Sequence, residues 1–505
     1  MRTKKFFFNS LSAFVLQLFT LFSGLIIPRI ILSSFGSEIN GLVSSITQII
    51  TYFTLVEAGI SGSVIFSLYE PLLHKNYSKV SSIVTAGKNY YYKTGKLFLA
   101  CIIIFSFFYA FSVKTLLLSR TEVVLLALVI GMSGTIDFFL MAKYRVLLTA
   151  DQKTYVLYIA QITYIIINTL IIYFLAVTGF SILVVRSVAL SSVFVRSFVL
   201  FIYVKNKYSY INFKAEPDNS SLSKRWDALI LEILGVVRNA TPMLLATLFT
   251  SLKTVSIYAI YLIVTSGIRQ VLSIFETGLP SAFGEVIASK DIKKLQTINS
   301  EFETIYYSLI TIIYSVAIVM FLPFISLYTK GITDINYINP LLAFLFVLDA
   351  FTYNLKTPQG MLVISAGLYK ETRLQSAIQA LIIVVLGFAL TPILGLTGIM
   401  IASISANVFR TIDLIFFIPK HVTQTTYKYT LQKIIKSISI FSLTGVFVFY
   451  NYTNLYVNNW IFWIIRALLV TILYSFVMLC ILIITDRKNF FQLLSRIRFL
   501  NRKKK

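Results

Sequence analysis

Charged side chains inside long apolar runs are the residues of this sequence that could do chemistry. Asp137, Arg238, Arg269, Asp349 and Lys356 lie near the middle of such runs, with Arg410 at a similar depth. A charge at the centre of a bilayer costs about 2.5–3.5 kcal/mol, so such residues usually face a cavity or a partner. Basic groups dominate this set, and a guanidinium binds oxyanions bidentately. The pattern predicts a site for an anion such as phosphate or pyrophosphate.

Several of these residues are candidates for binding and others for coupling. The arginines of the first, seventh and eighth runs are expected to line one cavity, and the predicted substrate-binding residues are Arg29, Arg238, Arg269, Lys356 and Asn239. The acidic residues predicted to couple transport to an ion, or to gate it, are Glu57, Asp137, Glu276 and Asp349. No catalytic or metal-binding residue is predicted, since the two histidines lie far from any carboxylate cluster.

Other membrane-embedded charges favour structural roles. Arg410 and Asp413 are three residues apart on one helix and can neutralise each other. Arg186, Arg196 and Arg466 lie near enough to span ends to extend their charges toward the membrane surface.

Two prolines mark expected irregularities in membrane helices. Pro242 follows Arg238 by one helical turn, and Pro358 follows Lys356 by two residues. A proline removes a backbone hydrogen bond and can kink or break a helix. Broken helices at membrane depth are tolerated where they line a wet cavity and are common in transporter sites. The alternative for the second case is a packing kink whose Lys356 pairs with Asp349 or reaches the membrane surface.

The composition places these residues in an integral membrane protein. Of 505 residues 57% are hydrophobic and 13% charged, and the mean hydropathy is +0.82. A soluble globular protein would be about 25% charged, and a soluble nucleic-acid binder would explain the net charge of +25 but not the apolar runs. We count fourteen candidate spans, so the expected fold is an all-α membrane protein with about 14 transmembrane helices.

The positions of lysine and arginine predict the orientation. With the N-terminus inside, alternate loops on that side hold 33 of the 45 basic residues, and the opposite loops hold 4. Basic residues accumulate in cytoplasmic loops. Both termini are therefore expected in the cytoplasm, and the first apolar run is expected to be retained because it lacks a signal-peptide cleavage site.

An internal repeat indicates how the spans are grouped. Glu70, Lys75, Lys79, Val80 and Ile83 match Glu285, Lys290, Lys294, Leu295 and Ile298 at an offset of 215 residues. The first copy also predicts a basic amphipathic helix on the inner leaflet, attracted by anionic lipid. A repeat of six spans gives two parallel six-helix lobes plus two extra helices. The predicted divisions are an N-lobe at 1–205, a linker at 206–227, a C-lobe at 228–420, spans 13 and 14 within 421–485, and a basic cytoplasmic tail at 486–505.

The sequence also resembles a known group of transporters. The resemblance is carried by Ile27-Pro28-Arg29, Phe35-Gly36-Ser37-Glu38-Ile39-Asn40-Gly41-Leu42, Glu57-Ala58-Gly59-Ile60 and Ser256-Ile257-Tyr258. These segments are similar to the polysaccharide flippases of the multidrug/oligosaccharidyl-lipid/polysaccharide (MOP) exporter superfamily. In related flippases basic residues on spans 1, 2, 7 and 8 line the cavity. Span 2 departs from that pattern here, with Glu57 and no basic residue between Asn40 and Tyr69.

The resemblance implies a function and its partners. It implies a flippase for capsule, O-antigen or exopolysaccharide synthesis that works by alternating access in a bacterial cytoplasmic membrane. The substrate would be an oligosaccharide on undecaprenyl pyrophosphate, moved from the inner to the outer leaflet. We expect no cofactor and no nucleic-acid partner, coupling to H⁺, Na⁺ or the membrane potential, and a monomer that contacts anionic lipids. A polysaccharide polymerase and glycosyltransferases would be further partners.

Three alternatives remain open at this stage. A flippase for a peptidoglycan precursor or a teichoic-type lipid shares the diphosphate chemistry, whereas an ion-coupled multidrug antiporter would favour acidic residues in its cavity. A polysaccharide polymerase or ligase typically needs a large external loop, and the longest one expected here is near 328–338. The sequence contains no Walker A motif.

Overall fold

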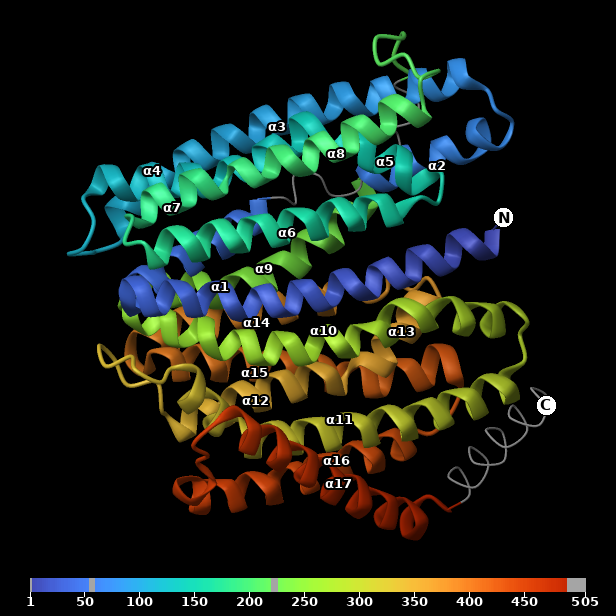
Figure 1. The fold of residues 1–505 in the computed structure, drawn as a ribbon. Coiled ribbons are helices and arrows are strands. Elements are labelled where there is room, and N and C mark those ends of the chain that lie inside the picture. The colour runs from blue at the N-terminus through green and yellow to red at the C-terminus, as the bar shows by residue number, and fades with distance from the viewer. Residues whose placement is uncertain (1, 54–59, 219–225, 488–505) are drawn as a thin grey trace. The chain divides into compact units, whose positions relative to one another are not determined.

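A computed structural model describes residues 2–53, 60–218 and 226–487, and these residues form helices and no strands (Figure 1). By the contacts between residues, the chain divides into two compact units, Met1–Ala259 and Ile260–Lys505. The division falls within a helix and does not test the predicted lobe boundaries.

The described residues of the first unit form nine α-helices and the start of a tenth. They are α1 (Arg2–Phe53), α2 (Ile60–Leu73), α3 (Tyr77–Ser112), α4 (Arg120–Ile136), α5 (Ala142–Ala150), α6 (Thr154–Val177), α7 (Ile182–Ala189), α8 (Ser191–Lys207), α9 (Trp226–Phe249) and the start of α10 (Leu252–Ala288). A π-helical turn at Asp137–Met141 joins α4 to α5.

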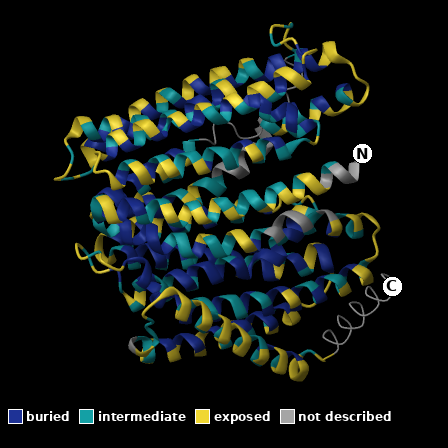
Figure 2. Ribbon diagram, in the orientation of Figure 1, coloured by how far each residue is buried: buried dark blue, intermediate teal, exposed yellow. Residues whose placement is uncertain are grey.

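The second unit contains the rest of α10 and the helices that follow. They are α11 (Ile292–Tyr328), α12 (Pro340–Leu355), α13 (Thr357–Ser365), α14 (Arg373–Leu394), α15 (Leu396–Ile418), α16 (Tyr427–Asn451) and α17 (Trp460–Thr485). Most side chains of α17 are exposed, which suits a helix in contact with lipid (Figure 2).

The structure confirms an all-helical membrane protein with about fourteen spans. Eleven helices of the described residues are long and apolar enough to cross a membrane. The other three predicted spans are not separate long helices, and each has a local reason. The first two spans are joined into α1 across a kink at Gly36, α9 has only a short apolar part at Leu234–Phe249, and the tenth span is divided between α12 and α13.

Several residues that carry the resemblance are required by the backbone conformation or make specific contacts. Gly36 has a φ of +80°, a backbone conformation that residues other than glycine rarely adopt, and the helix is kinked there. The Oε1 atom of Glu38 accepts hydrogen bonds from the Thr115 hydroxyl at 2.5 Å and from the Leu116 amide at 3.1 Å. One turn into α10, Ser256 accepts a hydrogen bond of 2.6 Å from the Asn40 amide. A Cβ atom at Gly41 would lie 1.9 Å from the Leu252 carbonyl oxygen, so only glycine fits there.

The repeat is visible in the backbone of two pairs of turns. Lys75 and Lys290 both have positive φ, at 54° and 56°, and Asn76 and Asp291 then cap α3 and α11 through the amides of Lys79 and Lys294.

A second pair of turns shows the same offset. The amide of Lys153 donates to the carbonyl of Leu148, and the amide of Leu368 donates to that of Val363. Gln152 and Gly367, also 215 residues apart, have φ of 55° and 68°. Both turns follow the pattern of a helix that ends in a left-handed residue. Equivalent positions of the repeat therefore fold alike.

The predicted separate amphipathic helix on the inner leaflet is wrong. The segment belongs to the first turns of α3, which continues to Ser112, and Val80 and Val84 are fully buried. Helical spacing of apolar residues indicates a buried face whether that face meets lipid or protein, so the spacing alone could not separate the two cases.

The first and sixth helices run side by side in the same direction. Lys5, Asn9 and Ser23 of α1 hydrogen-bond to Asp151, Tyr155 and Thr169. All three pairs are 146 residues apart, as expected for parallel helices. The beginning of α1 is thus attached to the turn between α5 and α6.

Candidate functional site

Two irregular helix junctions lie at equivalent positions of the repeat. In the first unit the π-helical turn ends at Met141 and α5 begins at Ala142. In the second unit α12 ends at Leu355, Lys356 caps it, and α13 begins at Thr357. Ala142 and Thr357 are 215 residues apart. The helix is interrupted where Pro358 predicted an irregularity, and this does not by itself separate a cavity-lining break from a packing kink. π-Helical turns such as the one at Asp137–Met141 are frequent at functional sites.

The break in the second unit holds a buried polar cluster centred on Asn407. The Lys356 ammonium donates to the Asn407 amide oxygen at 2.9 Å, and the Asn407 amide nitrogen donates to Asp349 Oδ1 at 3.0 Å. Ser403 also donates to Asp349, at 2.5 Å, and Gln379 donates to Asn407 at 3.3 Å. Lys356 and Asp349 are each 8% exposed. The expected link between these two residues exists, but it runs through Asn407.

Arg269 joins this cluster from α10. Its guanidinium carbon lies 5.3 Å from the centre of the Tyr353 ring, and the Lys356 ammonium lies 4.5 Å from the same ring. Cations are attracted to the face of an aromatic ring. Among the side chains that the structure describes here, two cations and one carboxylate give the cluster a formal charge of +1. A guanidinium stacked on a ring keeps its in-plane N–H groups available for an oxyanion.

The junction in the first unit has a cluster of the same composition. Asp137 lies between Arg196, at 2.9 Å, and Arg145, at 3.3 Å. The Arg196 guanidinium also lies 5.1 Å from the centre of the Tyr164 ring and donates to Gln161. One carboxylate and two cations, counted over the described contacts alone, again leave a formal charge of +1.

Two predictions for structural charges have different outcomes. Arg410 and Asp413 form the predicted ion pair on α15. Arg196, by contrast, does not extend to a helix end, because it crosses to Asp137 on the neighbouring junction. Arg466 donates to the backbone carbonyl of Leu455.

The remaining predicted site residues are not part of either charged cluster. Arg29 is partly buried on α1 and Arg238 is partly buried on α9. Asn239 is exposed, and its backbone carbonyl accepts a hydrogen bond of 2.6 Å from the Tyr52 hydroxyl. Both arginines belong to the first unit, and their predicted contact with substrate stays a prediction. Glu57 and the side chain of Glu276 lie outside the described residues.

Sequence reasoning missed a buried carboxylate on α11. Glu303 is 3% exposed. It accepts hydrogen bonds from Gln359 at 3.1 Å and Thr430 at 2.9 Å, and it forms an ion pair with Lys433 at 3.4 Å. These contacts join α11 to α13 and α16. Only charges within long apolar runs were considered, and Glu303 lies just before the apolar run of α11.

Asn407 and Ser403 were missed for another reason, because all the candidates except Asn239 were ionisable residues. Ser403, Asn407 and Arg410 recur at a helical spacing of four and three residues, and this polar stripe could have identified the face of α15 that meets the cluster. Among the described residues, no group of three histidine, cysteine, aspartate or glutamate side chains could hold a metal ion.

Comparisons with known proteins agree with this architecture. No protein-family model and no curated protein matches the sequence. An inward-facing multidrug resistance MATE family transporter of the MOP superfamily has a TM-score of 0.67 at 13% identity, over 84% of this chain and 98% of that one. The lipid II flippase MurJ, in an inward closed conformation, has a TM-score of 0.63 at 15% identity, over 94% and 99%.

A third solved structure, a MOP superfamily transporter from Pyrococcus furiosus, has a TM-score of 0.52 at 13% identity, over 84% of this chain and 96% of that chain. Its description reports a reverse polarity of the binding pocket that suggests a different function. The solved structures similar to this chain are thus of transporters and a flippase. At such identities the likeness concerns the arrangement of helices. This chain is a multi-pass membrane protein with the fold of the MOP superfamily transporters.

Proposed function

We propose that this protein is a flippase for a lipid-linked oligosaccharide carried on undecaprenyl pyrophosphate. It moves this substrate from the cytoplasmic to the outer leaflet of a bacterial cytoplasmic membrane, for synthesis of capsule, O-antigen or exopolysaccharide. The observation that carries the proposal is the pair of cations, Arg269 and Lys356, on one aromatic ring beside a break in the tenth span.

The charge of this cluster suits a diphosphate. A buried site with an excess of positive charge attracts an anion strongly, because the low dielectric weakens screening. Arg269 is proposed to bind the diphosphate oxygens through its N–H groups, with Lys356 as a second charge. A lipophilic cation would be repelled by both residues, and this disfavours the multidrug antiporter.

The membrane potential can contribute to the direction of transport. An inside-negative potential favours outward movement of an anion by about 2.3 kcal/mol per charge per 100 mV. Coupling to H⁺ or Na⁺ through Asp137, Asp349, Glu57 or Glu276 remains a prediction.

A second candidate substrate is a peptidoglycan precursor. The fold is similar to that of the lipid II flippase MurJ over 94% of this chain. Such a precursor presents the same diphosphate, so the cluster would bind both substrates and only the glycan would differ.

Flipping in reconstituted vesicles tests the proposal. Proteoliposomes would contain a fluorescent polyprenyl-diphosphate oligosaccharide, and a membrane-impermeant quencher would measure how much reaches the other leaflet. Arg269→Gln and Lys356→Gln should each lower the rate about tenfold or more, because charged hydrogen bonds contribute about 1.5–3 kcal/mol.

Arg373→Gln is the matched control, since this arginine is exposed at the start of α14, and it should flip normally. Wild-type rates in both cluster variants, at equal amounts of folded protein, would refute the role of the cluster. Repeating the assay with a lipid-linked peptidoglycan precursor decides between the two substrates.

A further inference from the structure

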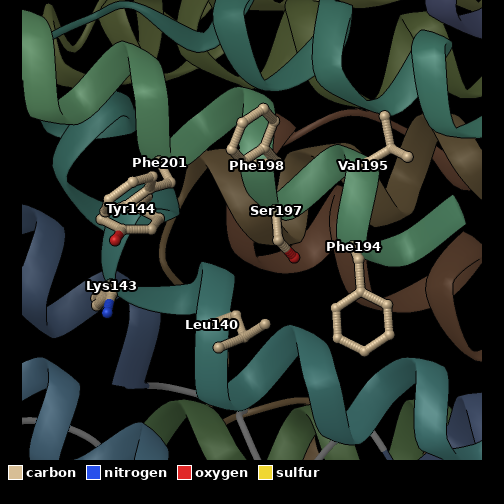
Figure 3. Close-up of a pocket in the computed structure, with 8 residues that line it drawn as sticks. All are labelled: Leu140, Lys143, Tyr144, Phe194, Val195, Ser197, Phe198 and Phe201. Atoms are coloured by element: carbon tan, nitrogen blue, oxygen red, sulfur yellow. The ribbon is translucent and has the colours of Figure 1, made fainter. Parts of the chain in front are cut away.

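A groove whose lining includes none of Asp137, Arg145 and Arg196 lies along the middle of α8, from Phe194 to Phe201. It has a volume of about 540 Å³ and is bounded by Leu140 of the π-helical turn, by Lys143 and Tyr144 of α5, and by one face of α8 (Figure 3). Pockets of about 300–1,000 Å³ are of the size that holds small ligands.

The wall that α8 contributes is a stripe of phenylalanines. Phe194, Phe198 and Phe201 follow one another at a spacing of four and three residues, so they share one face of the helix. Their exposed fractions are 52%, 59% and 45%. The stripe extends about 10 Å along the helix at 1.5 Å per residue. Phe194 lies at one end of the groove, and Phe201 and Lys143 lie at the other (Figure 3).

Three lysines gather at the Phe201 end. The Lys143 ammonium lies 4.8 Å from the centre of the Tyr144 ring and 5.4 Å from that of Phe213. Lys88 donates to the Phe213 carbonyl at 3.2 Å, so it lies beside Lys143.

The third lysine lies on α8 itself. The Lys205 ammonium is 5.8 Å from the centre of the Phe201 ring. Within the part of the chain that the structure describes, none of these three lysines forms an ion pair with a carboxylate. The end of the groove is therefore basic while its length is apolar.

We infer that this groove binds one anionic glycerophospholipid, with an acyl chain along the phenylalanine stripe and the phosphate at Lys143, Lys88 and Lys205. The lipid comes from the leaflet at the C-terminal end of α8, the side to which the distribution of basic residues assigns the cytoplasm. An apolar groove open to lipid takes an acyl chain, and the lysines distinguish an anionic headgroup from a zwitterionic one. The inference does not depend on the identity of the transported substrate.

Quenching of a tryptophan in the groove tests the inference. Phe198→Trp would be made in the full chain with the three native tryptophans replaced by phenylalanine, and reconstituted with brominated phosphatidylglycerol or brominated phosphatidylcholine. The control is Phe476→Trp on α17, an exposed position that is also nine residues before the end of its helix.

Tryptophan at 198 should reach half-maximal quenching at a fraction of phosphatidylglycerol that is about fivefold lower than the fraction of phosphatidylcholine required. The reason is that one basic residue near the membrane surface contributes about 1 kcal/mol to the binding of an anionic lipid. Tryptophan at 476 should show no preference. Lys143→Gln should reduce the preference, whereas Lys428→Gln, an exposed residue at the start of α16, should leave it unchanged.

Three results would overturn the inference. The first is equal quenching at position 198 by both lipids, and the second is a preference that survives Lys143→Gln combined with Lys88→Gln. The third is displacement of phosphatidylglycerol from the groove by a short polyprenyl phosphate at equal concentration, which would assign the groove to the tail of the substrate. None of these readouts requires flipping, so failure here is distinct from failure of the proposed function.

Discussion

Arg269 and Lys356 lie over the same aromatic ring, that of Tyr353, although they come from helices far apart in the sequence. The ring attracts each cation and so offsets part of their mutual repulsion. Lys356 is also held by Asn407, whereas the Arg269 guanidinium keeps N–H groups available. The arrangement places two positive charges on one ring at a helix break.

Removing the ring should weaken substrate binding. Tyr353→Leu deletes the shared face, which contributes about 0.5–2 kcal/mol per cation, and we expect flipping at low substrate concentration to fall about fivefold or more. Tyr353→Phe keeps the face and should retain most of the activity. Initial rates across a range of substrate concentrations provide the measurement. Equal loss in both variants would assign the effect to the hydroxyl.

Asn407 should be a stability determinant as well as a site residue. Asn407→Leu leaves the buried Lys356 and Asp349 without the amide that joins them, at a cost of about 2–4 kcal/mol. Thermal unfolding in detergent should show a lower Tm. Adding Lys356→Met and Asp349→Asn should recover much of it, because the two buried charges that Asn407 joins are then both absent. A triple variant as unstable as Asn407→Leu alone would contradict this account.

The ion pair between Asp137 and Arg196 should be coupled energetically. Asp137→Asn leaves Arg196 partly buried beside a neutral group and should cost about 2–3 kcal/mol. In the double variant with Arg196→Gln the loss should be smaller than the sum of the two single losses by about 1–2 kcal/mol. Denaturation of the four proteins measures this coupling, and strict additivity would show that the pair contributes nothing.

Stability should depend on pH through Asp151, which lies in the turn between α5 and α6. Burial by itself raises the pKa of Asp151, but hydrogen bonds from Lys153, Tyr208 and Lys5 outweigh it and hold the pKa below the ordinary 3.8. A carboxylate with a lowered pKa in the folded state contributes stability above the unfolded value, and this contribution is lost as the pH falls through the folded value.

Asp151→Asn should therefore lower the Tm at pH 7 and lower it less at pH 3, which lies below the ordinary pKa of 3.8. The control is Asp291→Asn, because asparagine can also cap α11, and its effect should be small at both pH values. Unfolding curves at the two pH values decide the matter, and a loss for Asp151→Asn that is the same at both would exclude the charge as its cause.

Neighbouring residues made some features predictable. Arg410 and Asp413 are three apart on one helix, so their pair required no knowledge of the tertiary fold. Pro358 predicted the break at Lys356 because a proline removes a local hydrogen bond. Arg196 was expected to extend toward the membrane surface instead. Its pairing with Asp137, 59 residues away, depends on how two helices face each other and could not be predicted from neighbouring residues.

By itself, the sequence determined the number and length of the spans, the expected sidedness, the repeat and the break in the tenth span, because each follows from local apolar length, charge placement or backbone chemistry. Only the tertiary structure placed Arg269 and Lys356 on Tyr353, joined Lys356 to Asp349 through Asn407, and buried Glu303 against Lys433. The physical reason is that a membrane helix is apolar both where it meets lipid and where it meets protein. Hydrophobic periodicity therefore does not report which way such a helix is turned, and helix packing decides which polar residues meet.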